Sequence, residues 1–355
     1  MSFCFGEHLK ISLFGASHAP SVGALVEGLP AGEPVDREAL AAFLRRRAPG
    51  REGVSPRREP DEVEVLSGLS LGKTTGEPLR LEIRNRDVRP EDYADFSRFP
   101  RPSHADYPAL VRGGRVLTGS GTASGRMTAP LCAAGGICLQ ILARQGIAAG
   151  AHLLSVGAVS DRAFDPVSPE LSQIGKDFPV LSREAGEAMR AAIARAGEEG
   201  DSLGGVIECA ATGLPVGTGE PFFDGWESLL GHLLFAVPGV KGVSFGSGFA
   251  GAALRGSENN DPYLPGTPLK TETNRAGGLL GGYTTGMPLL FSLACKPTPS
   301  IVREQKTVDL ETGEPALLRI RGRHDPCFAV RAVPVAEACL GLVAGDLLWR
   351  NGHGD

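Results

Sequence analysis

One segment, residues 128–145, constrains the fold more than any other part of this sequence. Its residues are apolar on almost every side of a helix of about five turns. A helix that is hydrophobic all round has to be buried on all sides, so we expect this one at the centre of the fold. The composition permits such a core, because 42% of the 355 residues are hydrophobic.

The other expected elements come in groups rather than in alternation. Strand patterns occupy residues 10–14, 21–26, 62–66, 79–83, 206–211, 242–245 and 287–295. Helix patterns run from a cap at Asp36 to the arginines before Pro49, and over residues 182–196, 226–235 and 335–349. Grouped strands with hairpin-length links favour an α+β sandwich over a doubly wound parallel sheet. We find no repeat and no linker, so we expect one domain over residues 1–355.

Composition excludes several classes of protein. The first ten residues mix acids and bases without an apolar run, and we expect no membrane helix and a cytoplasmic location. The net charge of −5 argues against general nucleic-acid binding. The seven cysteines include no CxxC pair, so we expect neither a disulfide framework nor a metal site, and most should be small buried hydrophobes.

Arginine and glycine are both concentrated. Arginines occupy positions 45–47, 51, 57 and 58, which indicates either a solvated helix end or an anion-binding surface. The 49 glycines are about twice the usual share and gather at 113–125, 242–256 and 277–286. Glycine lets the backbone approach a ligand closely, so three such loops suggest a large molecule held by main chain. A simple turn remains the alternative for any one loop.

Two nucleotide-binding signatures are incomplete. Residues 67–74 come close to a phosphate-binding P-loop, but the leading glycine is one position late and a strand pattern follows where a helix is needed. Residues 246–251 match GxGxxG after a strand, but turn-forming residues 254–261 follow. We therefore disfavour both a nucleotide triphosphatase and a dinucleotide-binding dehydrogenase.

Three polar loops carry histidines beside arginine or glycine. They contain His18, His104 and the pair His324 and Asp325. A single loop histidine is more often a surface residue than a catalyst. Three loops of this kind favour proton transfer, because histidine titrates near neutral pH.

A series of short motifs runs along the chain. They are FGASH (14–18), RRAPG (46–50), REPDE (58–62), RPSHADY (101–107), DSLGG (201–205), GEPFFD (219–224), VKG (240–242), GSGFAG (246–251), RGSENND (255–261), GGLLGG (277–282), KPTPS (296–300), GRHDPC (322–327) and RAVP (331–334). By these motifs the sequence resembles the chorismate synthase family over almost its whole length, from Phe5 to Arg350. The motifs occur in family order, and the series is far more specific than any one of them.

The resemblance implies an α+β fold in which a helical layer is sandwiched between two antiparallel β-sheets, assembled as a homotetramer. It also implies a lyase of the shikimate pathway, which serves aromatic amino acid biosynthesis. Such an enzyme makes chorismate by anti-1,4-elimination of phosphate from 5-enolpyruvylshikimate 3-phosphate, and it needs reduced FMN although there is no net redox change. In the family view the flavin lends electron density while phosphate leaves, then accepts the ring proton. No inserted segment indicates a built-in reductase, so NADPH is expected only as an indirect reductant.

Catalytic roles follow from the resemblance by position. His18 would protonate the departing phosphate, His104 would tune the reduced flavin, and Asp325 would assist proton removal near it. Substrate contacts are expected from Ser17, Arg46, Arg47, Arg51 and Arg126. A substrate with one phosphate and two carboxylates needs several cations, and arginine binds such groups in bidentate fashion.

Flavin contacts are expected from the glycine loop and from three later segments. They are Thr122, Ala123, Ser124, Pro238, Gly239, Gly281, Lys296, Pro297, Thr298, Pro299, Ser300 and Arg323. Lysine and arginine there would neutralise the anionic reduced flavin and its phosphate.

The glycine loop departs from the family pattern DYRGGGRSSARETA. Two arginines are replaced by Thr118 and Thr122, and a serine by Ala123. Each lost arginine contact would cost on the order of 1.5 to 3 kcal/mol, so the two would weaken binding by about two to four orders of magnitude if nothing compensates. The alternative hypothesis is therefore a catalytically altered relative that binds flavin or an anionic metabolite without turnover.

Overall fold

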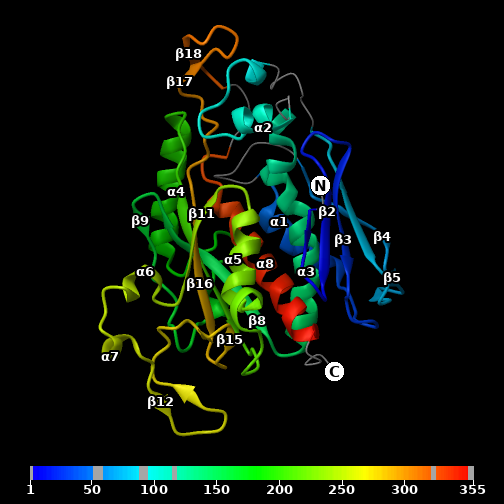
Figure 1. Ribbon diagram of the computed structural model, residues 1–355, viewed down its shortest axis with the longest axis vertical. Coiled ribbons are helices and arrows are strands. Elements are labelled where there is room, and N and C mark those ends of the chain that lie inside the picture. The colour runs from blue at the N-terminus through cyan, green and yellow to red at the C-terminus, as the bar shows by residue number, and fades with distance from the viewer. Residues whose placement is uncertain (1–2, 51–58, 88–94, 114–117, 321–324, 351–355) are drawn as a thin grey trace.

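Two five-stranded antiparallel sheets form the outer layers of the protein (Figure 1). The computed structural model describes residues 3–50, 59–87, 95–113, 118–320 and 325–350. The first sheet has the order β1 (Cys4–Phe5), β2 (Lys10–Gly15), β3 (Ser21–Glu27), β7 (Leu79–Arg84) and β4 (Val63–Ser67). The second has the order β11 (Val240–Phe245), β16 (Leu289–Cys295), β10 (Gly205–Thr212), β8 (Ala148–Val156) and β9 (Val159–Ser160).

A layer of helices lies between these sheets. Helices α3 (Thr128–Arg144) and α8 (Ala329–Arg350) pack along each other, and α1 (Arg37–Arg47) contacts both. Helix α3 packs on β3 and β7 of the first sheet, whereas α8 packs on β8 and β10 of the second. Helix α5 (Trp226–Ala236) covers β11 and contacts α8. The expected α+β sandwich is confirmed, and the apolar segment 128–145 is its central helix, as predicted (Figure 1).

Smaller elements decorate the edges and ends of this sandwich. They are β5 (Leu69–Ser70), β6 (Lys73–Thr74), α2 (Asp106–Gly113), α4 (Arg183–Glu198), α6 (Gly248–Gly251), α7 (Gly256–Asn259), β12 (Tyr263–Leu264), β13 (Lys270–Thr271), β14 (Leu279–Leu280), β15 (Tyr283–Thr284), β17 (Gln305–Val308) and β18 (Pro315–Leu318). Short 3₁₀ helices are η2 (Thr118–Ala123), η3 (Gly125–Met127), η4 (Leu171–Gln173) and η5 (Phe222–Asp224).

Local signals set several boundaries as expected. Asp36 caps α1, because its Oδ1 accepts from the backbone N–H groups of Glu38 and Ala39, each at 2.9 Å. Ser182 caps α4 in the same way. The P-loop-like residues 67–74 contain the hairpin of β5 and β6. The GxGxxG residues 246–251 contain the four-residue α6, and the next helix along the chain is the four-residue α7. Both segments therefore lack the long helix that a nucleotide-binding loop requires.

Helix α8 and strand β8 are the long elements that differ most from the sequence prediction. Helix α8 begins at Ala329 rather than at residue 335, with Pro334 inside its second turn. A proline there removes only one backbone hydrogen bond near the start of the helix, and the buried α8 residues on both sides compensate through packing. Strand β8 was not expected, because its first residues are alanine and glycine, which give no strand pattern.

The expectation of no membrane-length helix is wrong by length and composition. The segments Gly125–Arg144 and Ala329–Arg350 are long and apolar enough to cross a membrane. Their apolar windows are, however, 83% and 100% buried inside the fold. Two sheets cover them, so they are core helices in this structure.

Most cysteines are buried, as predicted. Six of the seven lie in the interior, and Cys4 is exposed. Burial raises the pKa of the Cys132 and Cys138 thiols to about 12, so these groups stay protonated. They pack as small hydrophobic side chains.

Candidate active site

A pocket of about 410 Å³ forms where loops from distant parts of the chain meet beside the first turn of α8. Its size falls within the range of small-molecule sites, about 300 to 1,000 Å³. The lining residues are Ser103, His104, Ala105, Ser120, Ala123, Gly125, Pro238, Gly239, Lys241, Lys296, Pro297, Thr298, Pro299, Asp325 and Phe328. Two of the three residues expected to handle protons, His104 and Asp325, therefore share one cavity.

His104 is fixed by a contact between two of the lining loops. Its Nε2 lies 2.6 Å from Ser300 Oγ, and Lys296 Nζ donates to the backbone oxygen of Ser103 at 2.8 Å. The loop before α2 is itself rigid, because the buried Arg101 and Asp106 form a bidentate pair with two contacts of 2.7 Å. The His104 imidazole therefore lies on a loop that is fixed by these contacts, and it lines the pocket.

The lining of the pocket includes two lysines and a buried hydroxyl group that has no hydrogen-bond partner among the described residues. Lys241 and Lys296 both line it, and no salt bridge joins either one to a carboxylate among the residues described. Burial lowers the pKa of Lys296, and the charge of Lys241 lowers it further. The Oγ1 atom of Thr298 is buried and has no hydrogen-bond partner in the described part of the chain. A buried polar atom of this kind is expected to bond to a ligand or water.

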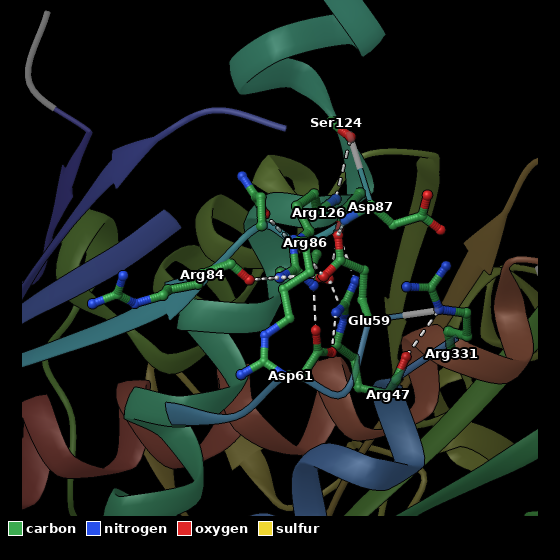
Figure 2. A network of polar contacts seen from close by, with 12 residues as sticks. Arg47, Glu59, Asp61, Arg84, Arg86, Asp87, Ser124, Arg126 and Arg331 are labelled. Atoms are coloured by element: carbon green, nitrogen blue, oxygen red, sulfur yellow. Dashed lines mark hydrogen bonds and ion pairs between the residues drawn. The ribbon is translucent and has the colours of Figure 1, made fainter. Parts of the chain in front are cut away.

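Behind the pocket lies a buried arginine–aspartate cluster, which consists of Arg47, Asp61, Arg126 and Arg331 (Figure 2). Arg47 and Arg126 each donate from Nη1 to a different oxygen of Asp61. Arg331 donates to the backbone oxygen of Arg47 at 2.9 Å and to Asp325 Oδ2 at 2.7 Å. The cluster thereby reaches a carboxylate of the pocket wall.

Asp61 is the centre of this cluster. Its side chain is 0% exposed, and its backbone has a φ of 53°, in the left-handed region that Asp tolerates better than most residues. Burial alone would raise the pKa of Asp61, but the charges of Arg47 and Arg126 outweigh it and hold the pKa below its usual value. The carboxylate is therefore ionised and orients both arginines.

Arg47 and Arg126 also contact the walls of the site. Arg47 donates from Nη2 to the oxygen of Gly125, a lining residue, at 3.3 Å. Burial lowers the pKa of Arg126 and of Arg331. Removing a guanidinium from water disfavours its charged form, because the charge loses its hydration. A nearby anion would stabilise the charged form again.

His18 lies on the turn between β2 and β3, next to the same wall. Its Nδ1 is 3.1 Å from Oγ of the buried Ser17. The Ser17 N–H donates to the backbone oxygen of Gly121 at 3.2 Å. Gly121 belongs to η2, whose neighbouring residues Ser120 and Ala123 line the pocket. The turn is therefore joined to the pocket wall rather than being part of the lining.

Other predicted site residues lie elsewhere. Arg46 forms a bidentate pair with Glu337, at 2.6 and 2.8 Å, on the side of α8 that faces β8. Gly281 lies in the turn between β14 and β15, beside Leu280 and Tyr283, which line a separate cavity of about 880 Å³. The structure brings neither residue to the pocket.

Of the remaining predicted site residues, some lie on the 3₁₀ helices η2 and η3, some lie outside the described residues, and the others line the pocket. Thr122 is exposed on η2, and Ser124 caps η3 by accepting from the Arg126 N–H at 3.3 Å. Arg51 and Arg323 lie outside the described residues. Of the residues predicted to form the site, those that line the pocket are His104, Ala123, Pro238, Gly239, Lys296, Pro297, Thr298, Pro299 and Asp325.

Three residues of the pocket and of the cluster behind it were not predicted from the sequence. Lys241 and Phe328 line the pocket, and Asp61 orients the arginines behind it. Lys241 and Asp61 do occur in the motifs VKG and REPDE, which marked them as part of a pattern. Their roles depend on contacts across the fold, which the motifs do not specify.

The chain is similar to known proteins of a single family. A family model described as chorismate synthase matches residues 9–348. The chain is 43% identical to a chorismate synthase of Korarchaeum cryptofilum over 354 residues, which cover 99% of this chain and 98% of that protein. It is 46% identical to one of Aeropyrum pernix over 348 residues, covering 97% and 92%.

A solved structure supports the same relationship. A crystal structure of a chorismate synthase superposes on this chain with a TM-score of 0.77 at 27% sequence identity. The match covers 98% of this chain and 93% of that one.

Proposed function

Because this chain belongs to the chorismate synthase family, we propose that it eliminates phosphate from 5-enolpyruvylshikimate 3-phosphate to give chorismate. The observation that carries the proposal is one pocket that holds His104, Asp325, Lys241 and Lys296. Proton-handling groups and cations are what such an elimination needs from a protein, since phosphate must leave and a ring proton must be removed.

The pocket fits FMN, and we propose that it binds the reduced form. Its volume of about 410 Å³ suits a cofactor, and Lys241 and Lys296 would neutralise the anionic flavin. The buried Thr298 hydroxyl, which has no partner among the described residues, offers a hydrogen bond to the bound cofactor. When bound, reduced FMN supplies electron density to the reaction.

The roles that we propose for the protein's own residues are those that the family resemblance implies, and the contacts of these residues support them. His104 is held at Ser300 on a braced loop, so it would orient the flavin and tune its protonation. Asp325, held by Arg331, would assist removal of the ring proton. His18, beside Ser17, would protonate the departing phosphate, and Arg47 and Arg126 would supply positive charge behind the substrate.

The direct test is a strictly anaerobic assay with reduced FMN and enolpyruvylshikimate phosphate. We expect equal amounts of phosphate and chorismate, with no net oxidation of the flavin. A matched reaction with oxidised FMN should give neither product. Absence of turnover in the reduced, anaerobic reaction, from protein shown to be folded, would contradict the proposal.

A second candidate is a relative that binds flavin without turnover. It is favoured by one observation, that η2 carries Thr118 and Thr122 where the family carries arginines. Tight FMN binding with no chorismate formed would select this alternative. Chorismate production would exclude it.

We also propose that the protein is a cytoplasmic homotetramer, in which NADPH acts only through an outside reductant. Large exposed aromatic side chains support self-association, since Phe222, Phe223 and Phe249 are each more than 85% exposed. Light scattering coupled to size-exclusion chromatography should give four times the monomer mass. A monomeric mass at micromolar concentration would contradict this proposal.

A further inference from the structure

The turn that carries Ser17 and His18 makes few backbone hydrogen bonds of its own among the described residues. Within the turn, the Ala19 N–H donates to the oxygen of Ala16 at 3.1 Å. The neighbouring Gly15, the last residue of β2, has a φ of 88°, in the left-handed region that favours glycine. Such a turn depends on external contacts for its position, because one internal bond does not fix it.

Asn85, directly after β7, supplies three of those contacts. Its Nδ2 donates to the backbone oxygens of Ala16 at 3.0 Å and Ala19 at 2.7 Å. Its own N–H donates to the oxygen of Pro20 at 3.0 Å. One residue thus holds the turn on both sides of His18.

The same amide is anchored on the other side by Arg126. The Oδ1 atom of Asn85 accepts from Arg126 Nε at 2.8 Å. The reverse orientation of the amide would point its NH₂ group at a guanidinium and its oxygen at two carbonyl oxygens, so the contacts permit only one orientation. Arg126 is itself held by Asp61 and donates to the oxygen of Arg84 at 3.3 Å. The Asn85 side chain therefore connects the turn to the arginine–aspartate cluster.

We propose that Asn85 is a positioning residue, which fixes the His18 imidazole relative to Arg126. This inference rests on the proposed function, in which His18 donates a proton to the departing phosphate. Misplacing a reacting group by about 1 Å is enough to slow a reaction roughly 100-fold. Asn85 therefore acts through His18 and need not touch the substrate.

The test compares Asn85→Ala and Asn85→Asp with wild type. The aspartate has the same shape and keeps the acceptor for Arg126, but it places an oxygen against the carbonyl oxygens of Ala16 and Ala19. We expect each variant to lower kcat by roughly 10- to 100-fold, with FMN affinity unchanged. Wild-type kcat in both variants would overturn the proposal.

A double-mutant cycle with His18→Ala separates positioning from general damage. If Asn85 acts through His18, Asn85→Ala should have no further effect on kcat once the imidazole is gone. Equal effects in both backgrounds would mean that Asn85 acts in another way, and would refute the inference.

Asn274, which lines the separate cavity of about 880 Å³ and not the pocket, provides a matched control. Its Nδ2 also donates to two backbone oxygens, those of Pro166 and Pro288, both at 2.8 Å, and its Oδ1 accepts from the Gly278 N–H at 2.7 Å. Asn274→Ala removes an equivalent clamp, so it should lower thermal stability while leaving kcat near the wild-type value. An equal loss of kcat there would show that clamp removal alone explains the Asn85 result.

A measurement without turnover keeps the inference separate from the proposed function. In ¹⁵N-labelled protein, Asn85→Ala should shift the ring nitrogen resonances of His18, whereas Asn274→Ala should not. Shifted His18 signals in a protein that makes no chorismate would mean that the proposed function fails and the positioning contact stands. Unchanged His18 signals would overturn the inference whatever the activity.

Discussion

The two ends of α8 use buried charge in different ways. At the end beside the pocket, Arg331 bridges Asp325 and the backbone of Arg47, next to the shared carboxylate of Asp61. At the other end, Oδ1 of Asp346 accepts from the backbone N–H groups of residues 7, 8 and 9 at 3.1, 2.7 and 2.9 Å, and Oδ2 accepts from Arg350 at 2.9 Å.

The difference indicates what each end is for. Asp346 accepts from backbone donors in the bend between β1 and β2, so it joins the N-terminal segment to the core. At the pocket end, burial lowers the pKa of Arg126 and Arg331, so these cations lack part of their solvation. We infer that the far end serves stability, whereas the pocket end is organised for an anionic ligand.

The largest expected effect is on turnover at the pocket end. His18→Ala and His104→Ala should each lower kcat by about 10² to 10⁴, while the melting temperature stays close to that of wild type. Anaerobic kinetics and thermal unfolding of the same samples measure the two quantities. Full activity in either variant would remove that histidine from the mechanism and weaken the distinction between the two ends.

The next effect should appear only in stability, at the far end of α8. Asp346→Ala leaves three backbone donors without their acceptor and should lower the free energy of unfolding by about 3 kcal/mol. Denaturant unfolding gives this value, and kcat below the unfolding transition should be unchanged. Asp346→Asn, which keeps an acceptor oxygen, is the control and should be milder. A large loss of kcat in folded Asp346→Ala would contradict the inference that this end of α8 serves stability.

A smaller effect should fall on cofactor affinity. Lys241→Met removes one positive charge from the pocket but keeps a side chain of similar length. One charge-assisted contact is worth about 1.5 kcal/mol or more, so Kd for FMN should rise roughly tenfold. The difference should shrink at high salt, because screening weakens the wild-type contact. Identical Kd values for variant and wild type at low salt would place the flavin away from Lys241.

The smallest effect concerns acid stability. The pKa of Asp61 is held below its usual value of about 3.9 by Arg47 and Arg126 against the opposing effect of burial. The stabilising contribution is therefore fully present above that pH, and it is lost as pH falls through the lowered pKa of the folded state. The stability difference between wild type and Asp61→Asn should narrow as the pH falls below about 4. A constant difference between neutral and strongly acidic pH would mean that Asp61 is already protonated in the fold.

Much of the fold could be predicted from local patterns. The strands at β2, β3, β7 and β10 and the central helix α3 follow from residue periodicity, because one or both faces of each are buried. Strand β8 could not be predicted, since small residues carry no period, and Pro334 suggested a later start for α8.

The site was predictable only where ordered motifs marked it. His104, Lys296 and Asp325 were found through the resemblance, and the pocket brings them together. Asn85 was not found, because its partners Ala16 and Arg126 lie 69 and 41 residues away along the chain. Contacts of this range depend on how the sheets and loops pack, which local sequence does not encode.

The most direct test of the account is a crystal structure of the protein soaked with FMN and enolpyruvylshikimate phosphate. We expect density for the flavin in the pocket lined by His104, Lys241, Thr298 and Asp325, with the substrate on the side of His18 and Arg126. Density for the flavin at another site, with this pocket filled only by water, would contradict the account.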